Sequence, residues 1–230
     1  MWHAPCQSPP LRTGPRRSRS VLDVAETPPP QTEPYGADFW SALYRSGDTR
    51  FDKGRVAPPI ARMARAGDIP RGRVLVPGGG RGHDALALAQ LGFAVTVVDI
   101  APEACEAAVS AARALDVPLE VRCEDVLVET LAARRGTFDA IVEHTFFCAI
   151  DPSRRPEYVD ACAELLRPGG VLTGLFFVLG RPGGPPFDVT EPEIRGLFGP
   201  RFALERLRLA ADSFPERLGR ELEARFLRTR

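Results

Sequence analysis

The stretch Leu75–Phe93, LVPGGGRGHDALALAQLGF, is an apolar run followed by a glycine-rich turn and alternating Ala and Leu. Such a turn between a strand and a helix lets a ligand lie against the backbone, at the positive end of the helix. Asp99, in VTVVDIAPEA, stands at the end of the next apolar run. A carboxylate at that place binds ribose hydroxyls. The two features together predict a ligand that contains adenosine.

Two templates fit the glycine turn. Gly78-x-Gly80-x-Gly82 matches the turn of S-adenosylmethionine (SAM) methyltransferases, and Gly80-x-Gly82-x-x-Ala85 matches the dinucleotide fingerprint with Ala in the last place. Asp99 serves either ligand. The turn alone therefore leaves a nicotinamide oxidoreductase open beside a methyltransferase.

Three later features favour SAM. Asp125, in RCEDVL, follows the third predicted strand, where methyltransferases hold the adenine amino group. The segment LLRPGGVLTGLFF reads as a helix, a Pro-Gly-Gly turn and a strand, a pattern common before the fifth strand of these enzymes. The end of the chain predicts an antiparallel strand pair, and a dehydrogenase would instead need room there for a substrate domain.

Strands and helices are expected to alternate along the chain, which indicates a parallel sheet with crossover helices. Segments 202–210 and 222–230 alternate apolar and polar residues and are expected to pair antiparallel at one sheet edge. The expected strands are 74–76, 94–98, 119–121, 140–143 and 171–177, and the expected helices are 84–91, 102–115, 126–133 and 155–166.

The bulk composition narrows the class of protein. With 230 residues, 44% hydrophobic and 26% charged, the chain suits one globular domain, and its zero formal charge offers no electrostatic footprint for nucleic acid. No apolar run approaches the ~20 residues of a membrane span. Five scattered cysteines without a CxxC pair indicate reduced thiols, a cytoplasmic location and no metal site. Residues 1–35, rich in Pro, Ser and Arg, are expected to be a disordered tail before a domain over 36–230.

The chain resembles the thiopurine methyltransferase superfamily, nearest its thiol, halide and thiocyanate branch. The resemblance covers roughly residues 39–230 and is carried by FDKGRVAPPI, VPGGGRGHD, VDIAPEA, FDAIVEHTFFCAIDPSRRPEYV and GGPPF. It implies a class I, Rossmann-like α/β fold: a seven-stranded, mostly parallel sheet with helices on both faces and an antiparallel C-terminal strand. It also implies SAM as cofactor and a small-molecule nucleophile as methyl acceptor.

The resemblance assigns contacts to individual residues. It implies that an aromatic trio within an N-terminal lid over 36–70 covers the cofactor, that Gly78 and Asp99 bind its methionine and ribose parts, and that Asp125 and Val126 flank the adenine. His144 is placed beside the cofactor. The trio consists of Trp40, Tyr44 and Phe51.

Methyl transfer from a sulfonium requires alignment and a dry site rather than a strong base. A thiol with a pKa of about 8.5 arrives as a thiolate, so no general base is expected. The acceptor is expected to meet Phe147, Phe177 and Arg155, the last guiding an anion. Phe146 and Phe147 are adjacent, so one of the two rings is expected in the core instead.

Phe177 lacks the hydroxyl that halide and thiocyanate relatives carry at the end of the fifth strand. The sequence therefore favours the sulfur of an organic thiol or thiopurine-like compound as acceptor. Small anions, selenium or tellurium compounds, and a non-catalytic SAM-binding protein stay open as alternatives. A monomer is expected, because no long apolar stripe is left over to bind a partner.

Overall fold

The computed structural model describes residues 1, 34–127 and 134–229. The expected tail over 1–35 thus lies outside the described residues, except for Met1, Pro34 and Tyr35. The expected helix 126–133 also lies outside them, except for its first two residues. The described residues from Pro34 onwards belong to one compact unit.

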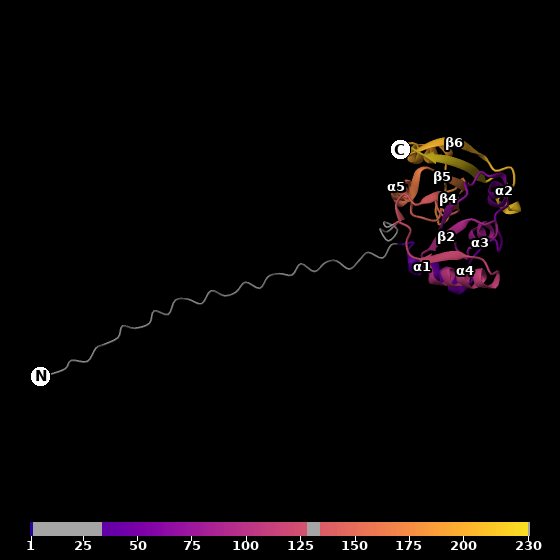
Figure 1. Ribbon diagram of the computed structural model, residues 1–230. Coiled ribbons are helices and arrows are strands. Elements are labelled where there is room, and N and C mark those ends of the chain that lie inside the picture. Colours follow the sequence, from indigo (N-terminus) through magenta and orange to yellow (C-terminus); the bar gives the residue numbers. More distant parts are fainter. Residues whose placement is uncertain (2–33, 128–133, 230) are drawn as a thin grey trace. The chain divides into compact units, whose positions relative to one another are not determined.

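Seven strands form one sheet in the order β3-β2-β1-β4-β5-β7-β6 (Figure 1). All pairings from β3 to β5 are parallel, whereas β7 runs antiparallel to both β5 and β6. This confirms the predicted fold class, including the antiparallel pair at the sheet edge. The strands are β1 (Arg73–Pro77), β2 (Ala94–Asp99), β3 (Leu119–Cys123), β4 (Phe138–His144), β5 (Leu166–Phe177), β6 (Phe202–Leu209) and β7 (Glu221–Arg228).

Helices cover both faces of the sheet. Apolar residues of α2 and α3 pack with one set of strand side chains, and those of α5 and α6 pack with the other set. In Figure 1, α1 and α4 lie together at the end of the sheet opposite the C-terminal strands. The helices are α1 (Ala37–Ser46), α2 (Pro58–Ala66), α3 (His83–Gln90), α4 (Pro102–Ala114), α5 (Arg155–Leu165) and α6 (Glu191–Phe198), with short 3₁₀ turns η2 (Pro152–Arg154) and η3 (Pro215–Arg217).

The Pro-Gly-Gly segment differs from the expected free turn. Strand β5 begins at Leu166, five residues before the predicted start, and pairs there with Phe138 of β4. The next pair joins Ala140 to Val171, so residues 167–170 bulge out of the ladder. A proline without an N–H and a following glycine with positive φ suit such a bulge better than regular pairing.

The strand order reverses between β1 and β4, and both strands point the same way. In open α/β sheets, ligands bind outside the carboxyl ends of the strands at such a reversal. The fold thus places the candidate site where the glycine turn after β1 meets the residues that follow β4.

Candidate active site

A cavity of about 530 Å³ opens at the carboxyl ends of the parallel strands. Its walls come from the ends of β2 and β5, the residues that follow β1, β3 and β4, and the N-terminal segment with α1. Every residue expected to bind the cofactor lines this cavity: Trp40, Tyr44, Phe51, Gly78, Asp99, Asp125, Val126 and His144. The structure therefore brings together residues that are far apart in the sequence.

Asp99 holds the glycine turn. Its Oδ2 accepts from the backbone N–H of Gly80 at 2.8 Å, and its Oδ1 accepts from that of Ala101 at 2.9 Å. Burial raises the pKa of the carboxyl, and the backbone donors oppose that rise. Asp99 thus shapes the turn besides facing the cavity, a task that the spacing of the motif does not reveal.

The turn presents bare backbone to the cavity. Gly78 and Gly80 both have positive φ, which favours glycine, and a side chain would clash with a neighbouring ring at Gly78 and crowd one at Gly80. A Cβ at Gly78 would lie 2.1 Å from Phe146 Cδ2, and one at Gly80 would lie 3.0 Å from Tyr44 Oη. The glycines are therefore required by the aromatic rings packed against them as well as by backbone conformation.

The three aromatic residues form one cluster beside the turn. The ring of Phe51 packs edge-on against Trp40 and against Tyr44, with centroids 5.7 Å apart in each case. The guanidinium of Arg81 lies 5.3 Å from the centre of the Tyr44 ring. Burial and the nearby charge of Asp99 raise the pKa of Tyr44, so its hydroxyl stays protonated.

Asp125 begins the wall expected to face the adenine. One of its oxygens accepts from the backbone N–H of Leu127 at 2.9 Å, and the other accepts from Arg154 Nη1 at 3.3 Å. Val126 is buried beside it and lines the cavity. Contact of these two residues with adenine stays a prediction.

His144, the last residue of β4, lies in a group of charged side chains. Its Nδ1 is 2.6 Å from Asp84 Oδ2, and its Nε2 is 2.9 Å from Arg217 Nη1 and 3.7 Å from Glu221 Oε1. Burial alone would lower the pKa of His144, but the carboxylates of Asp84 and Glu221 raise it to about 9. A neutral ring accepts from Arg217 through Nε2, and a protonated ring donates towards Glu221 instead.

Two expected acceptor contacts are wrong in position. Phe147 is 1% exposed and packs among the rings of Tyr158, Phe176 and Phe198 in the core, while Phe146 lines the cavity. The two rings part because β4 ends before them and an irregular turn sets their directions.

Arg155 is the second of these corrections. It is 2% exposed and does not line the cavity. Its Nε donates to the carbonyl oxygen of Phe147 at 3.2 Å, and its Nη1 donates to Glu193 at 2.5 Å. Its neighbour Arg154 lines the cavity instead. Arg155 therefore joins α5 to α6 rather than guiding an acceptor.

Phe177 lies where the sequence predicts it, at the end of β5 in the cavity wall. The guanidinium of Arg217 lies 5.3 Å from the centre of its ring. Arg217 also donates from Nη2 to the carbonyl oxygen of Phe51 at 2.9 Å, and its Nη1 pairs with Glu221 at 3.3 Å. Sequence reasoning missed Arg217, because nothing in its local pattern separates it from the surface arginines around it.

The comparisons with known proteins agree with this geometry. The family model described as Thiopurine S-methyltransferase (TPMT) matches residues 35–226. The chain belongs to the thiopurine S-methyltransferase family. It is 36% identical over 157 residues to a "Probable thiol methyltransferase 2" of Arabidopsis thaliana, covering 67% of this chain and 68% of that protein.

A "Thiocyanate methyltransferase 1" of Brassica oleracea is 33% identical over 170 residues, 73% of each chain. Among solved structures, the 1,6-didemethyltoxoflavin-N1-methyltransferase of Burkholderia thailandensis superposes with a TM-score of 0.67 at 21% identity, covering 84% of this chain and 87% of that one. That likeness shows the fold alone. Family and fold together identify the chain as a SAM-dependent methyltransferase, as the sequence predicts.

The residues that line the cavity of this family member are suited to bind SAM. The glycine turn and Asp99 lie in the same wall, so backbone without side chains and a carboxylate face the cavity together, as a ribose-bearing ligand requires. Within the described ranges, every helix falls short of the length and apolar character that a membrane crossing requires.

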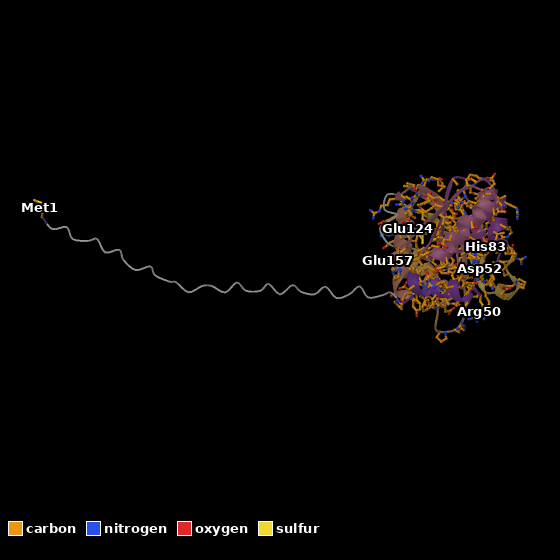
Figure 2. The ribbon with its side chains drawn as sticks, turned by 90° about the horizontal axis from the view of Figure 1, so that it is seen from below. Met1, Arg50, Asp52, His83, Glu124 and Glu157 are labelled. Carbon is orange, nitrogen blue, oxygen red and sulfur yellow. The ribbon has the colours of Figure 1, made fainter. Side chains whose placement is uncertain are left out.

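A second contact joins the N-terminal segment of this family member to the glycine turn. Asp52 accepts from Arg81 Nη1 at 2.6 Å. It also lies 3.0 Å from His83 Nε2, and Figure 2 labels these two residues beside each other. The nearby carboxylate of Asp52 raises the pKa of His83 above its usual value, with Asp84 adding to the rise and Arg81 opposing it. The segment carrying Phe51 is therefore tied to the glycine turn by an ion pair.

This ion pair predicts a pH dependence. Because the folded-state pKa of His83 is raised, its contribution to stability is complete below about pH 6.5 and is lost as pH rises through the folded value. We expect the difference in Tm between the parent and a His83→Ala variant to shrink from pH 6 to pH 9. A His83→Lys variant keeps its charge in that range, so its Tm relative to the Ala variant should stay level. A constant difference between parent and Ala variant would contradict the ion pair.

Proposed function

We propose that this chain transfers the methyl group of SAM to the sulfur of a small organic thiol. The proposal depends on one observation, namely that the carboxylates and imidazoles lining the cavity are already engaged by other side chains or by the backbone. Each carboxylate and imidazole that lines it in the described part of the chain already has a hydrogen-bond or ion-pair partner: Asp48, Asp52, His83, Asp84, Asp99, Glu124, Asp125, His144 and Glu216.

The imidazole between Asp84 and Arg217 is a poor base near neutral pH, because the pKa of His144 is raised to about 9 and its ring is already protonated. Such a site suits an acceptor that arrives already ionised. Alcohols and amines need a base to remove a proton during methyl transfer, whereas a thiol with a pKa of about 8.5 supplies its own thiolate. The names of the thiol and thiopurine relatives support the same acceptor atom.

The chain's own residues have three tasks in this reaction. When bound, SAM supplies an activated methyl group on its sulfonium. The glycine turn and Asp99 hold the cofactor, the aromatic cluster at Phe51 covers it, and the rings of Phe146 and Phe177 keep water from the acceptor. Removal of water favours a soft, weakly hydrated sulfur nucleophile.

A small anion such as thiocyanate is the second candidate, because one observation favours it. The Arg217 guanidinium lies against the Phe177 ring at the cavity wall and attracts negative charge there. A thiolate gains from the same cation. The cation therefore does not distinguish a thiolate from a small anion, and the difference between the two acceptors must come from their contact with the apolar ring of Phe177.

The apolar wall at Phe177 predicts a preference for organic thiols. An apolar ring gives a hydrated anion no replacement for its lost water, and it gives a thiol a surface to pack on, worth about 25 cal/mol per Å² buried. We expect kcat/KM for ethanethiol to exceed that for iodide or thiocyanate. Phe177→Tyr adds a hydroxyl donor and should shift the ratio towards the anions by about 1 kcal/mol, roughly fivefold.

Both proteins are assayed with ethanethiol, thiocyanate and iodide, and their Tm values are measured alongside. Phe176→Tyr is the matched control, since Phe176 is the neighbouring ring and lies in the core. That variant should lose stability and leave the ratio unchanged. An unchanged ratio in Phe177→Tyr contradicts the expected wall, and a parent that methylates no thiol contradicts the proposed function.

A further inference from the structure

Glu143 is a buried acid that the reaction does not use. It is the penultimate residue of β4 and is fully buried, and no salt bridge joins it to a cation in the described part of the chain. A carboxylate is costly to bury, and an apolar side chain there would spare the fold this cost. The hydrogen bonds that its two oxygens accept should therefore explain why a carboxylate is buried there.

Both oxygens accept hydrogen bonds. Oε1 accepts from the backbone N–H groups of Phe146 and Phe147, each at 2.9 Å, and Oε2 accepts from the Tyr158 hydroxyl at 2.5 Å. Burial raises the pKa of Glu143, and these three donors oppose that rise. The carboxylate thus joins the turn after β4 to α5.

The same turn contains a strained residue. Thr145 has a φ of +63°, a region that a β-branched residue rarely adopts. Conformations of this kind persist only where the surroundings impose them, and they gather at functional sites. Glu143 supplies the constraint, because it binds the two N–H groups that directly follow Thr145.

The constrained turn decides which ring reaches the cavity. Phe146 packs against the bare backbone of Gly78 and edge-on against Tyr158, with centroids 5.2 Å apart. Phe147 points into the core. If the turn relaxed, Phe146 would leave the glycine turn and the cavity would lose one wall.

We propose that Glu143 is a positioning residue of the methyl-transfer site, holding Thr145 in its strained conformation so that Phe146 closes the cavity against the glycine turn. The inference rests on the proposed function only in taking this cavity as the methyl-transfer site. It predicts that Glu143 governs cofactor affinity without contacting the cofactor.

The test is a double-mutant cycle that measures binding rather than turnover. The Kd for S-adenosylhomocysteine is obtained by calorimetric titration for the parent, Glu143→Leu, Thr145→Gly and the double variant. We expect Glu143→Leu to weaken binding at least tenfold when Thr145 is present. Glycine adopts positive φ without strain, so the same change should cost no more than threefold in the Thr145→Gly background.

Conservative and matched variants separate positioning from stability. The amide oxygen of Glu143→Gln can still accept from both N–H groups, so this variant should recover most of the affinity. Glu223, equally buried but outside the cavity, is the control: Glu223→Leu should lower Tm and leave the Kd unchanged. If Glu143→Leu does not fold, Tyr158→Phe replaces it in the cycle, with an expected loss of about threefold that Thr145→Gly removes.

The inference is overturned if Glu143→Leu binds S-adenosylhomocysteine like the parent, or if Thr145→Gly leaves the loss as large as before. Neither result bears on the proposed function, which stands or falls with methylation of a thiol by the parent protein.

Discussion

Replacing Asp99 by Ala is expected to remove most of the affinity for SAM. The carboxylate faces the cavity and also accepts the N–H groups of Gly80 and Ala101, so its loss removes a charged partner and loosens the glycine turn. Hydrogen bonds to charged groups contribute about 1.5–3 kcal/mol each, so Kd should rise by roughly 10- to 150-fold. Calorimetric titration with SAM measures the change.

Asp139 offers a matched control for this variant. It also accepts a backbone N–H, that of Arg73 at 2.8 Å, but it lies on β4 outside the cavity. Asp139→Ala should cost stability and leave the Kd for SAM as in the parent. Equal affinity of the parent and Asp99→Ala would show that the end of β2 does not bind the cofactor.

Replacing Arg217 by Ala is expected to lower the free energy of unfolding far more than removing an arginine from an exposed ion pair. Arg217 is almost fully buried and pairs with Glu221, which is buried too, while it also binds the carbonyl of Phe51. Removing one partner of a buried pair costs about 3–5 kcal/mol, and the low end is expected here because His144 still lies 3.7 Å from Glu221. At roughly 2–4 °C per kcal/mol for a chain of this size, a loss of ~3 kcal/mol lowers Tm by roughly 6–12 °C.

The exposed pair Arg201–Asp160, at 2.9 Å, provides the comparison. Exposed pairs contribute about 0–1 kcal/mol, so Arg201→Ala should leave Tm nearly unchanged. Thermal melting of both variants at pH 7 measures the contrast. Similar Tm values for the two variants would show that Arg217 is not held in a buried ion pair.

The sheet and the helices α3, α4 and α5 could be predicted from the sequence because their signals are local. Apolar runs of strand length alternate with helical segments, and a residue's place in such a pattern does not depend on distant residues. The glycine turn after β1 and Asp99 at the end of β2 were predictable for the same reason, since the motif joins them within one strand–helix–strand unit. Phe177 follows from its place at the end of β5.

The disordered tail expected over residues 1–35 and the lid expected over residues 36–70 stay predictions. The structure places α1 and the aromatic cluster in the cavity wall, which the resemblance had implied through Trp40, Tyr44 and Phe51. A lid must also move during the reaction, and the position of this segment in the cavity wall does not test that movement.

The sequence by itself determined where the parallel strands and the helices between them lie, and it also determined the glycine turn after β1 and Asp99 at the end of β2. Contiguous patterns of residues encode each of these features. Only the tertiary structure decided which of two adjacent rings, Phe146 or Phe147, faces the cavity, since an irregular turn has no period from which direction can be read. It also brought Arg217 to His144 across 73 residues and closed the buried contact between Glu143 and Tyr158. Such contacts depend on how separate elements pack, and packing is a property of the whole fold rather than of any segment.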